Sequence, residues 1–192
     1  MTEYLKLSAP PIDKREILRY AKSQREEDFS SILDDCVYKS GGVLNFNVCF
    51  CELEFTIQND LCDFGVFSVL SPSLALNLSK SRRVFLFMAS IGHGLDRLIA
   101  RYSRTSPLRA LLFNAIGTER VEALADSFVS YLEDKTEMKA MPRFSPGYGD
   151  LPLSLQGEVF DVLKPEKHMG VFLSESFVMS PSKSVTAFVG LK

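Results

Sequence analysis

The stretch RRVFLFMAS, residues 82–90, is almost wholly apolar after its two arginines. A strand buried on both faces reads as a continuous apolar run, whereas a strand with one wet face alternates apolar and polar residues. We therefore predict that residues 82–90 form a central strand that other elements cover on both sides.

The segment VLNFNVCFCELEFTI, residues 43–57, lies upstream and alternates apolar and polar positions. Its apolar side chains fall into two sets of different phase, the first being Leu44, Phe46, Val48 and Phe50, and the second Cys51, Leu53, Phe55 and Ile57. Such a change of phase indicates either a β-bulge or two strands joined by a tight bend. A further strand is expected over residues 64–70.

Helix signals surround these strands. Asp13 is placed to cap a first helix, and Ser71 followed by Pro72 is a typical helix start. A long helix is expected to start at Pro107, with Gly117 as its weak point. Helices are predicted over residues 13–23, near 27–38 up to Gly41-Gly42, after Ser71, after the glycine turn at 92–94, from Pro107 to about Thr136, and over 156–163.

The C-terminal part alternates again, which predicts two strands over residues 170–177 and 184–191. Pro181 cannot donate a ladder hydrogen bond and is expected to end the first of them. Strands and helices mix without a regular βαβ rhythm, so the predicted fold class is α+β with a largely antiparallel sheet. No repeat or composition shift divides the chain, and we expect a single domain over residues 1–192.

The composition excludes several classes of protein. A net charge of −2 over 192 residues argues against a nucleic-acid binder, because phosphate neutralisation needs an excess of Lys and Arg. No apolar run reaches the length of roughly 18 residues that spans a bilayer, and the N-terminus lacks the order of a signal peptide. A cytoplasmic protein without membrane contact is expected.

Four cysteines lie in the first third of the chain: Cys36, Cys49, Cys51 and Cys62. No Cys-x-x-Cys pair is present, and no histidine precedes His93. Buried reduced thiols are the favoured interpretation and a zinc site the weaker alternative, so no metal site is predicted.

The stretch SIGHGLDRL invites a dinucleotide-binding interpretation, because glycines follow a strand and open a helix. Arg97 stands where the third glycine of the motif belongs, so a tight strand-to-helix turn is favoured. His93 is expected to cap a helix or lie on the surface, and His168 to be solvated. No Gly-x-Ser-x-Gly elbow is present, and no catalytic residue is assigned.

The loop MPRFSPGYGDLP, residues 141–152, holds three prolines, two glycines and one arginine. The prolines exclude a helix and stiffen the loop. A guanidinium on such a rigid loop can bind a carboxylate through two parallel hydrogen bonds, which makes Arg143 a candidate ligand-binding residue. An ordinary surface arginine in a connector is an equally good interpretation of these residues alone.

Asp126 lies on the long helix, opposite its apolar face. That face consists of Val121, Leu124, Ala125, Phe128 and Leu132, while Glu122, Ser130 and Glu133 flank Asp126. From these residues alone, a solvated helix face is the favoured interpretation.

RFSPGYGDLP is followed about twenty-five residues later by LSESFVMSPSKSV. These two motifs, in this order, resemble the reactivation domain of cobalamin-dependent methionine synthase, and SIGHGLDRL and EALADSFVSYLED upstream are similar as well. The resemblance extends over about the last 110 residues. The matching positions are Arg143, Pro146, Gly147 and Tyr148, then Glu175, Ser176, Met179, Pro181, Ser184 and Val185.

The resemblance implies a cupped α+β domain, with a twisted antiparallel sheet and flanking helices, that binds S-adenosylmethionine. Arg143 would take the ligand's carboxylate, and Pro146, Gly147 and Tyr148 would line its adenosine. Asp126 would meet its charged ammonium or sulfonium end. In the family this domain docks on the cobalamin module and supports reductive methylation of cob(II)alamin, with an electron from a flavodoxin-type donor.

The second motif is expected to face the corrin, on a surface distant from the Arg143 pocket. This set comprises Ser176, Met179, Ser180, Pro181 and Ser182. The chain has no Asp-x-His-x-x-Gly motif for cobalamin, so the resemblance implies a free-standing reactivation subunit whose partner is a separate cobalamin-binding methionine synthase chain. The alternative is a module that caps a corrinoid protein without using S-adenosylmethionine. A self-sufficient methyltransferase is disfavoured.

Overall fold

A computed structural model of the chain describes residues 1–22 and 30–192. Its main sheet has the strand order β1-β2-β6-β9, and every neighbouring pair is antiparallel. The strands are β1 (Glu3–Lys6), β2 (Asn47–Leu53), β6 (Arg83–Ser90) and β9 (Ser184–Leu191). The predicted α+β class with an antiparallel sheet is therefore confirmed, with residues 82–90 as a central strand.

Both faces of this sheet are buried, each against a separate hydrophobic cluster. Along β2, Val48 and Phe50 enter one cluster, while Cys49 and Cys51 enter the other. Residues 43–57 hold two strands, as one of the two alternatives predicted: β2 and β3 (Thr56–Gln58), separated by Glu54 and Phe55. The break does not fall at the change of phase, because Phe50 and Cys51 both lie inside β2, which pairs with β6 without a bulge and points these side chains to opposite faces. A strand covered on both sides needs no change of phase to carry apolar residues at successive positions.

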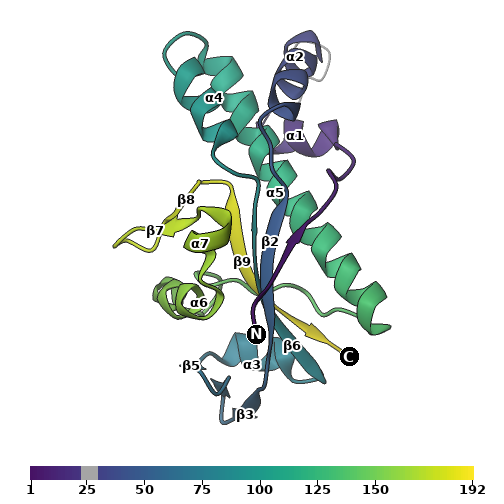
Figure 1. Ribbon diagram of the computed structural model, residues 1–192, viewed down its shortest axis with the longest axis vertical. Helices are drawn as coiled ribbons and strands as arrows, with labels where there is room; N and C mark the ends of the chain where they lie inside the picture. Colours follow the sequence, from purple (N-terminus) through teal and green to yellow (C-terminus); the bar gives the residue numbers. More distant parts are fainter. Residues whose placement is uncertain (23–29) are drawn as a thin grey trace.

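The first cluster packs the sheet against four helices: α1 (Lys14–Tyr20), α2 (Ser30–Gly41), α4 (Gly94–Tyr102) and α5 (Pro107–Thr136). Figure 1 shows α5 as the long green helix that runs obliquely beside the sheet, with α1, α2 and α4 around its first half. The second cluster packs the opposite face against α3 (Pro72–Leu78) and α6 (Gln156–Leu163), and α7 (Pro165–Met169) follows α6.

The predicted helix starts and the long helix are confirmed. The Asp13 carboxylate accepts the backbone N–H groups of Arg15 and Glu16, and Ser71 caps α3. α5 runs without a break through Gly117, the expected weak point. A Cβ at Gly117 would lie 2.5 Å from Leu95 Cδ2 and 2.8 Å from Lys183 Cγ, so glycine there permits close packing. Residues 27–29 of the expected second helix lie outside the described residues.

Two strand predictions are wrong because turns replace parts of them. Within residues 64–70 only β5 (Ser68–Leu70) is a strand, and a turn closed from Phe64 N–H to the Phe67 carbonyl precedes it. This turn links β5 to β4 (Leu61–Asp63), which pairs in turn with β3 (Thr56–Gln58). Gly65 at φ +75° permits the turn.

Within residues 170–177 only β7 (Phe172–Leu173) is a strand, and it pairs with β8 (Met179–Ser180). Residues 174–178 form the connecting turn, in which the Ser174 hydroxyl accepts the Val178 N–H at 3.1 Å. A serine side chain that bonds the backbone in this way competes with the strand ladder. Pro181 therefore follows the second strand of a small hairpin and does not end a long one.

All four cysteines are free and buried, as expected. Burial raises the pKa of the Cys49 thiol to about 12 and that of Cys51 to about 11, which keeps both protonated and unreactive at neutral pH. None of the helices within residues 1–22 and 30–192 combines the length and the hydropathy that a bilayer span requires.

Candidate functional site

The segment that carries Arg143 lies along β9, the edge strand of the main sheet. Phe144 and Phe188 exchange two backbone hydrogen bonds, of 2.9 and 2.8 Å, and Met141 N–H bonds to the Gly190 carbonyl. The Phe144 ring enters the second cluster. Because successive side chains of an extended segment point to opposite sides, Arg143 points the other way, toward α5.

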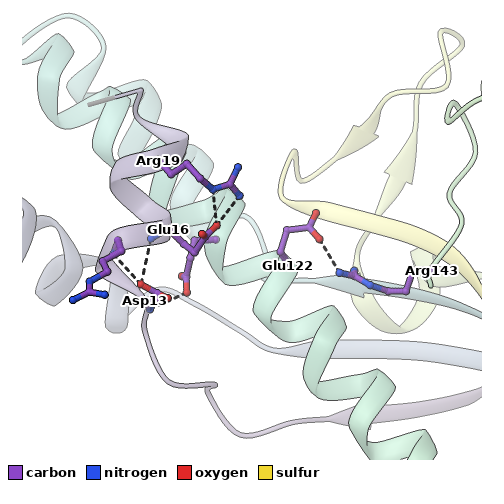
Figure 2. A network of polar contacts seen from close by, with 7 residues as sticks. Asp13, Glu16, Arg19, Glu122 and Arg143 are labelled. Atoms are coloured by element: carbon purple, nitrogen blue, oxygen red, sulfur yellow. Dashed lines mark hydrogen bonds and ion pairs between the residues drawn. The ribbon is translucent and has the colours of Figure 1, made fainter. Parts of the chain in front are cut away.

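Two acids of α5 receive this guanidinium. Arg143 Nη2 lies 2.8 Å from Asp126 Oδ1 and 3.0 Å from Glu122 Oε2. Figure 2 shows Glu122 reaching from α5 toward Arg143. The Arg143 side chain is 21% exposed, that of Glu122 41% and that of Asp126 71%. Asp126 therefore pairs with Arg143 and is not merely solvated.

Sequence reasoning placed Arg143 and Asp126 in one site but left out Glu122. The signal for Glu122 was its spacing, because residues four apart on a helix lie on the same side. Both acids contact Nη2, and within the described residues Nη1 and Nε make no hydrogen bond. An arginine with free donors beside two carboxylates is complementary to a group that carries both a carboxylate and an ammonium.

An acidic hollow between α5 and the N-terminal segment is lined in part by the same two acids. It has a volume of about 300 Å³ and is lined by Pro11, Asp13, Glu16, Tyr20, Glu119, Glu122, Ala123 and Asp126. In Figure 2, Asp13, Glu16 and Arg19 of the α1 region lie across from Glu122. Glu16 is already paired with Arg19 at 2.6 Å.

The buried pair of Glu119 and Arg120 ties the N-terminal segment to α5. Arg120 donates to the carbonyls of Pro10 and Pro11, each at 2.6 Å. Glu119 Oε1 accepts the Asp13 N–H at 3.0 Å. These contacts hold the wall of the hollow in place.

The loop after Arg143 is anchored at its far end by Asp150. The Asp150 carboxylate accepts the Ser71 hydroxyl, the Ser73 hydroxyl at 2.8 Å and the Ser73 N–H at 3.1 Å. These hydrogen bonds, that from Ser71 first, lower the pKa of Asp150. Nothing in the sequence pattern indicated this contact between residues far apart in the chain.

The tip of the same loop faces outward. Gly147 adopts φ +88°, and its N–H bonds to the Leu151 carbonyl at 2.8 Å. Tyr148 is 70% exposed, and its ring meets Phe144 edge-on with centroids 5.7 Å apart. Of the predicted adenosine-lining residues, Pro146 lines a groove, whereas Gly147 and Tyr148 lie outside its lining.

That groove has a volume of about 340 Å³, within the usual range of ligand pockets. It follows the start of β9 and is lined by Ser145, Pro146, Leu153, Gln156, Phe177, Val178, Met179, Ser182, Ser184, Val185 and Thr186. Pro146 and Met179 were expected on surfaces distant from one another, and the structure corrects this by placing both in one groove. The two residues are far apart in the sequence, and no local pattern predicted that the β7–β8 hairpin folds back beside the loop of residues 141–152.

The five residues expected to face the corrin differ in their surroundings. Ser182 donates its N–H and its hydroxyl to Asp96 of α4, at 2.8 and 2.6 Å. The hydroxyls of Ser176 and Ser174 lie 3.0 Å apart. Met179 is half-buried, Ser180 exposed and Pro181 buried. Asp96 was not predicted as a site residue.

Lys183 forms a second anchor beside Ser182. Its Nζ donates to Asn114 at 2.8 Å and to Thr118 at 3.1 Å, and burial lowers its pKa.

At the glycine turn, a Cβ on Gly94 would lie 2.1 Å from the Val43 carbonyl oxygen. Gly94 is therefore required by backbone packing, which supports the tight-turn interpretation. His93 Nε2 lies 3.0 Å from the Gly170 carbonyl.

Neither a family model nor a curated protein sequence matches the chain. Among solved structures, the crystal structure of the MetH reactivation domain bound to AdoHcy aligns with it at a TM-score of 0.72. The alignment covers 99% of this chain and 78% of that one. The chain has the fold of the MetH reactivation domain. At 14% identity, this likeness shows the fold alone.

Proposed function

We propose that this chain is a reactivation subunit of cobalamin-dependent methionine synthase that binds S-adenosylmethionine. The observation that carries the proposal is the Arg143–Glu122–Asp126 cluster in a fold whose solved example binds AdoHcy. AdoHcy is what S-adenosylmethionine becomes when it gives up its methyl group, so the same site would serve both compounds.

Arg143 and the two acids are complementary to the amino-acid end of such a ligand. Arg143 would take the α-carboxylate with Nη1 and Nε, which the protein leaves free, and with part of Nη2. Asp126, the more exposed of the two acids, would exchange its contact with Arg143 for the ligand's ammonium. The groove beside Pro146 and Met179 would hold the adenosine between apolar walls.

When bound, S-adenosylmethionine supplies an electrophilic methyl group, and the partner chain would supply the cobalamin that receives it. Met179 of the hairpin lines the groove, and Met179 and Ser180 would contact the corrin, with Ser182 held in place by Asp96. The electron for cob(II)alamin would come from a flavodoxin-type donor, and the assembly would work in the cytoplasm.

Two observations favour a second function. Arg143 is already paired with two acids, and Tyr148 projects into solvent. A module that caps a corrinoid protein and uses no S-adenosylmethionine would need neither residue for a ligand.

Reconstitution tests the proposal directly. The chain is mixed with a cobalamin-loaded methionine synthase that lacks its own reactivation domain, together with a reductant and S-adenosylmethionine. We expect turnover to be sustained longer than without the chain. Equal loss of turnover in both mixtures would contradict the proposal. Saturable binding of S-adenosylmethionine in calorimetry would exclude the capping alternative.

A further inference from the structure

We propose that Glu122 determines ligand specificity, by making the site prefer cationic S-adenosylmethionine over its neutral demethylated product, AdoHcy. This inference rests on the proposed function. Neither the sequence motifs nor the fold comparison gives Glu122 a role. The basis for one is the net charge of the cluster that Arg143 forms with Glu122 and Asp126.

The cluster carries a surplus negative charge. Arg143 contributes one positive charge, and Glu122 and Asp126 contribute two negative charges. Within residues 1–22 and 30–192, Arg143 is the cation that forms an ion pair with either acid. The nearby arginines are committed elsewhere, since Arg120 pairs with buried Glu119 and Arg19 with Glu16.

A bound amino-acid group leaves this surplus in place. The ligand's carboxylate offsets the charge of Arg143, and its ammonium offsets that of Asp126. Glu122 then keeps one negative charge without a partner on the ligand. Three bonds separate the α-carbon of S-adenosylmethionine from its sulfonium, so this positive charge falls close to the cluster. AdoHcy has a neutral sulfur at the same position and gains nothing from Glu122.

The preference will be moderate because Glu122 is partly exposed. Its side chain is 41% exposed, and water and salt weaken attraction at such a position. The effect is therefore carried by Coulomb attraction without direct contact, and it must fall as ionic strength rises.

The test measures both ligands on three proteins by calorimetry: wild type, Glu122→Gln, and Asp134→Asn as a matched control. Asp134 is an exposed acid on the same helix, twelve residues or about 18 Å further along its axis. We expect Glu122→Gln to lower the ratio of the AdoHcy Kd to the S-adenosylmethionine Kd about threefold to tenfold. Asp134→Asn should leave the ratio unchanged, and high salt should lower the wild-type ratio toward that of Glu122→Gln.

Two outcomes overturn the inference. If Glu122→Gln weakens both ligands equally, Glu122 only holds Arg143 in place and selects nothing. If the wild type binds both ligands equally at low salt, the surplus charge has no effect on specificity. Both outcomes leave the proposed function intact, whereas failure of the wild type to bind either ligand contradicts the function and this inference together.

Discussion

Two ion-pair clusters lie about one turn apart on α5 and differ in their exposure to water. Glu119 and Arg120 are buried, with side chains 5% and 2% exposed, and bind backbone groups of the N-terminal segment. Glu122 and Asp126 stay partly in water and share the guanidinium of Arg143. The same kinds of side chain therefore form a structural tie in one place and an exchangeable contact in the other.

Burial decides the difference. Removing one partner from a buried pair leaves an uncompensated charge without water, whereas an exposed acid that loses its partner is rehydrated at little cost. A site that must release its own contacts to take a ligand needs the second kind of pair. The buried pair beside it keeps α5 and the N-terminal segment in register.

The largest effect is expected from a substitution that breaks the buried pair. Arg120→Met leaves Glu119 buried without a cation and removes both hydrogen bonds to the prolines. We expect the free energy of unfolding to fall by about 3–5 kcal/mol in urea titration. The double variant Glu119→Leu/Arg120→Met should recover much of this loss. A cost below about 1 kcal/mol for Arg120→Met would contradict the structural role of the pair.

The next effect concerns the exchangeable pair. Arg143→Ala should weaken S-adenosylmethionine binding by about 2–4 kcal/mol, the scale for removing one partner of a hydrogen-bonded charge pair. Stability should barely change, because both acids that it releases are already partly exposed. Calorimetry and thermal melting measure the two quantities. A variant that melts normally and binds as well as the wild type would remove Arg143 from the site.

Met179→Asp tests whether the groove and the Arg143 cluster form one binding site. A charge introduced at half-buried Met179, in the groove that Pro146 also lines, is costly to desolvate when a ligand or a corrin closes the groove. Because the loop and hairpin share the groove, we expect S-adenosylmethionine affinity and partner docking both to weaken, the former by about 1–3 kcal/mol. Loss of docking with ligand affinity unchanged would show that the adenosine lies elsewhere.

The smallest effect is a pH dependence at the loop anchor. Hydrogen bonds lower the pKa of folded Asp150, so its contribution to stability is present above the unfolded pKa and disappears as pH falls through the folded one. Thermal melting should show the wild type losing more stability than Asp150→Asn below about pH 4. Parallel curves for the two proteins would show that the anchor contributes nothing in solution.

Local signals in the sequence predicted most elements well. The caps at Asp13 and Ser71 and the bounds of α5 and α6 follow from residues near one another in the chain, and the structure confirms them. The errors at residues 64–70 and 170–177, and in the position of the break within residues 43–57, arose because alternation was taken as the only signal. Burial of both sheet faces, a glycine turn and a serine hydroxyl changed the outcome at these places.

The sequence by itself determined the α+β class and the central strand, and it named Arg143 and Asp126 as candidate site residues, because periodicity, caps and motifs are local properties. Only the tertiary structure decided which of those residues meet. It placed Arg143 on Glu122 as well as Asp126, joined Pro146 and Met179 in one groove, and tied Asp150 to Ser71. Those contacts join segments far apart in the chain, and they depend on how helices and hairpin pack on the sheet, which no local pattern encodes.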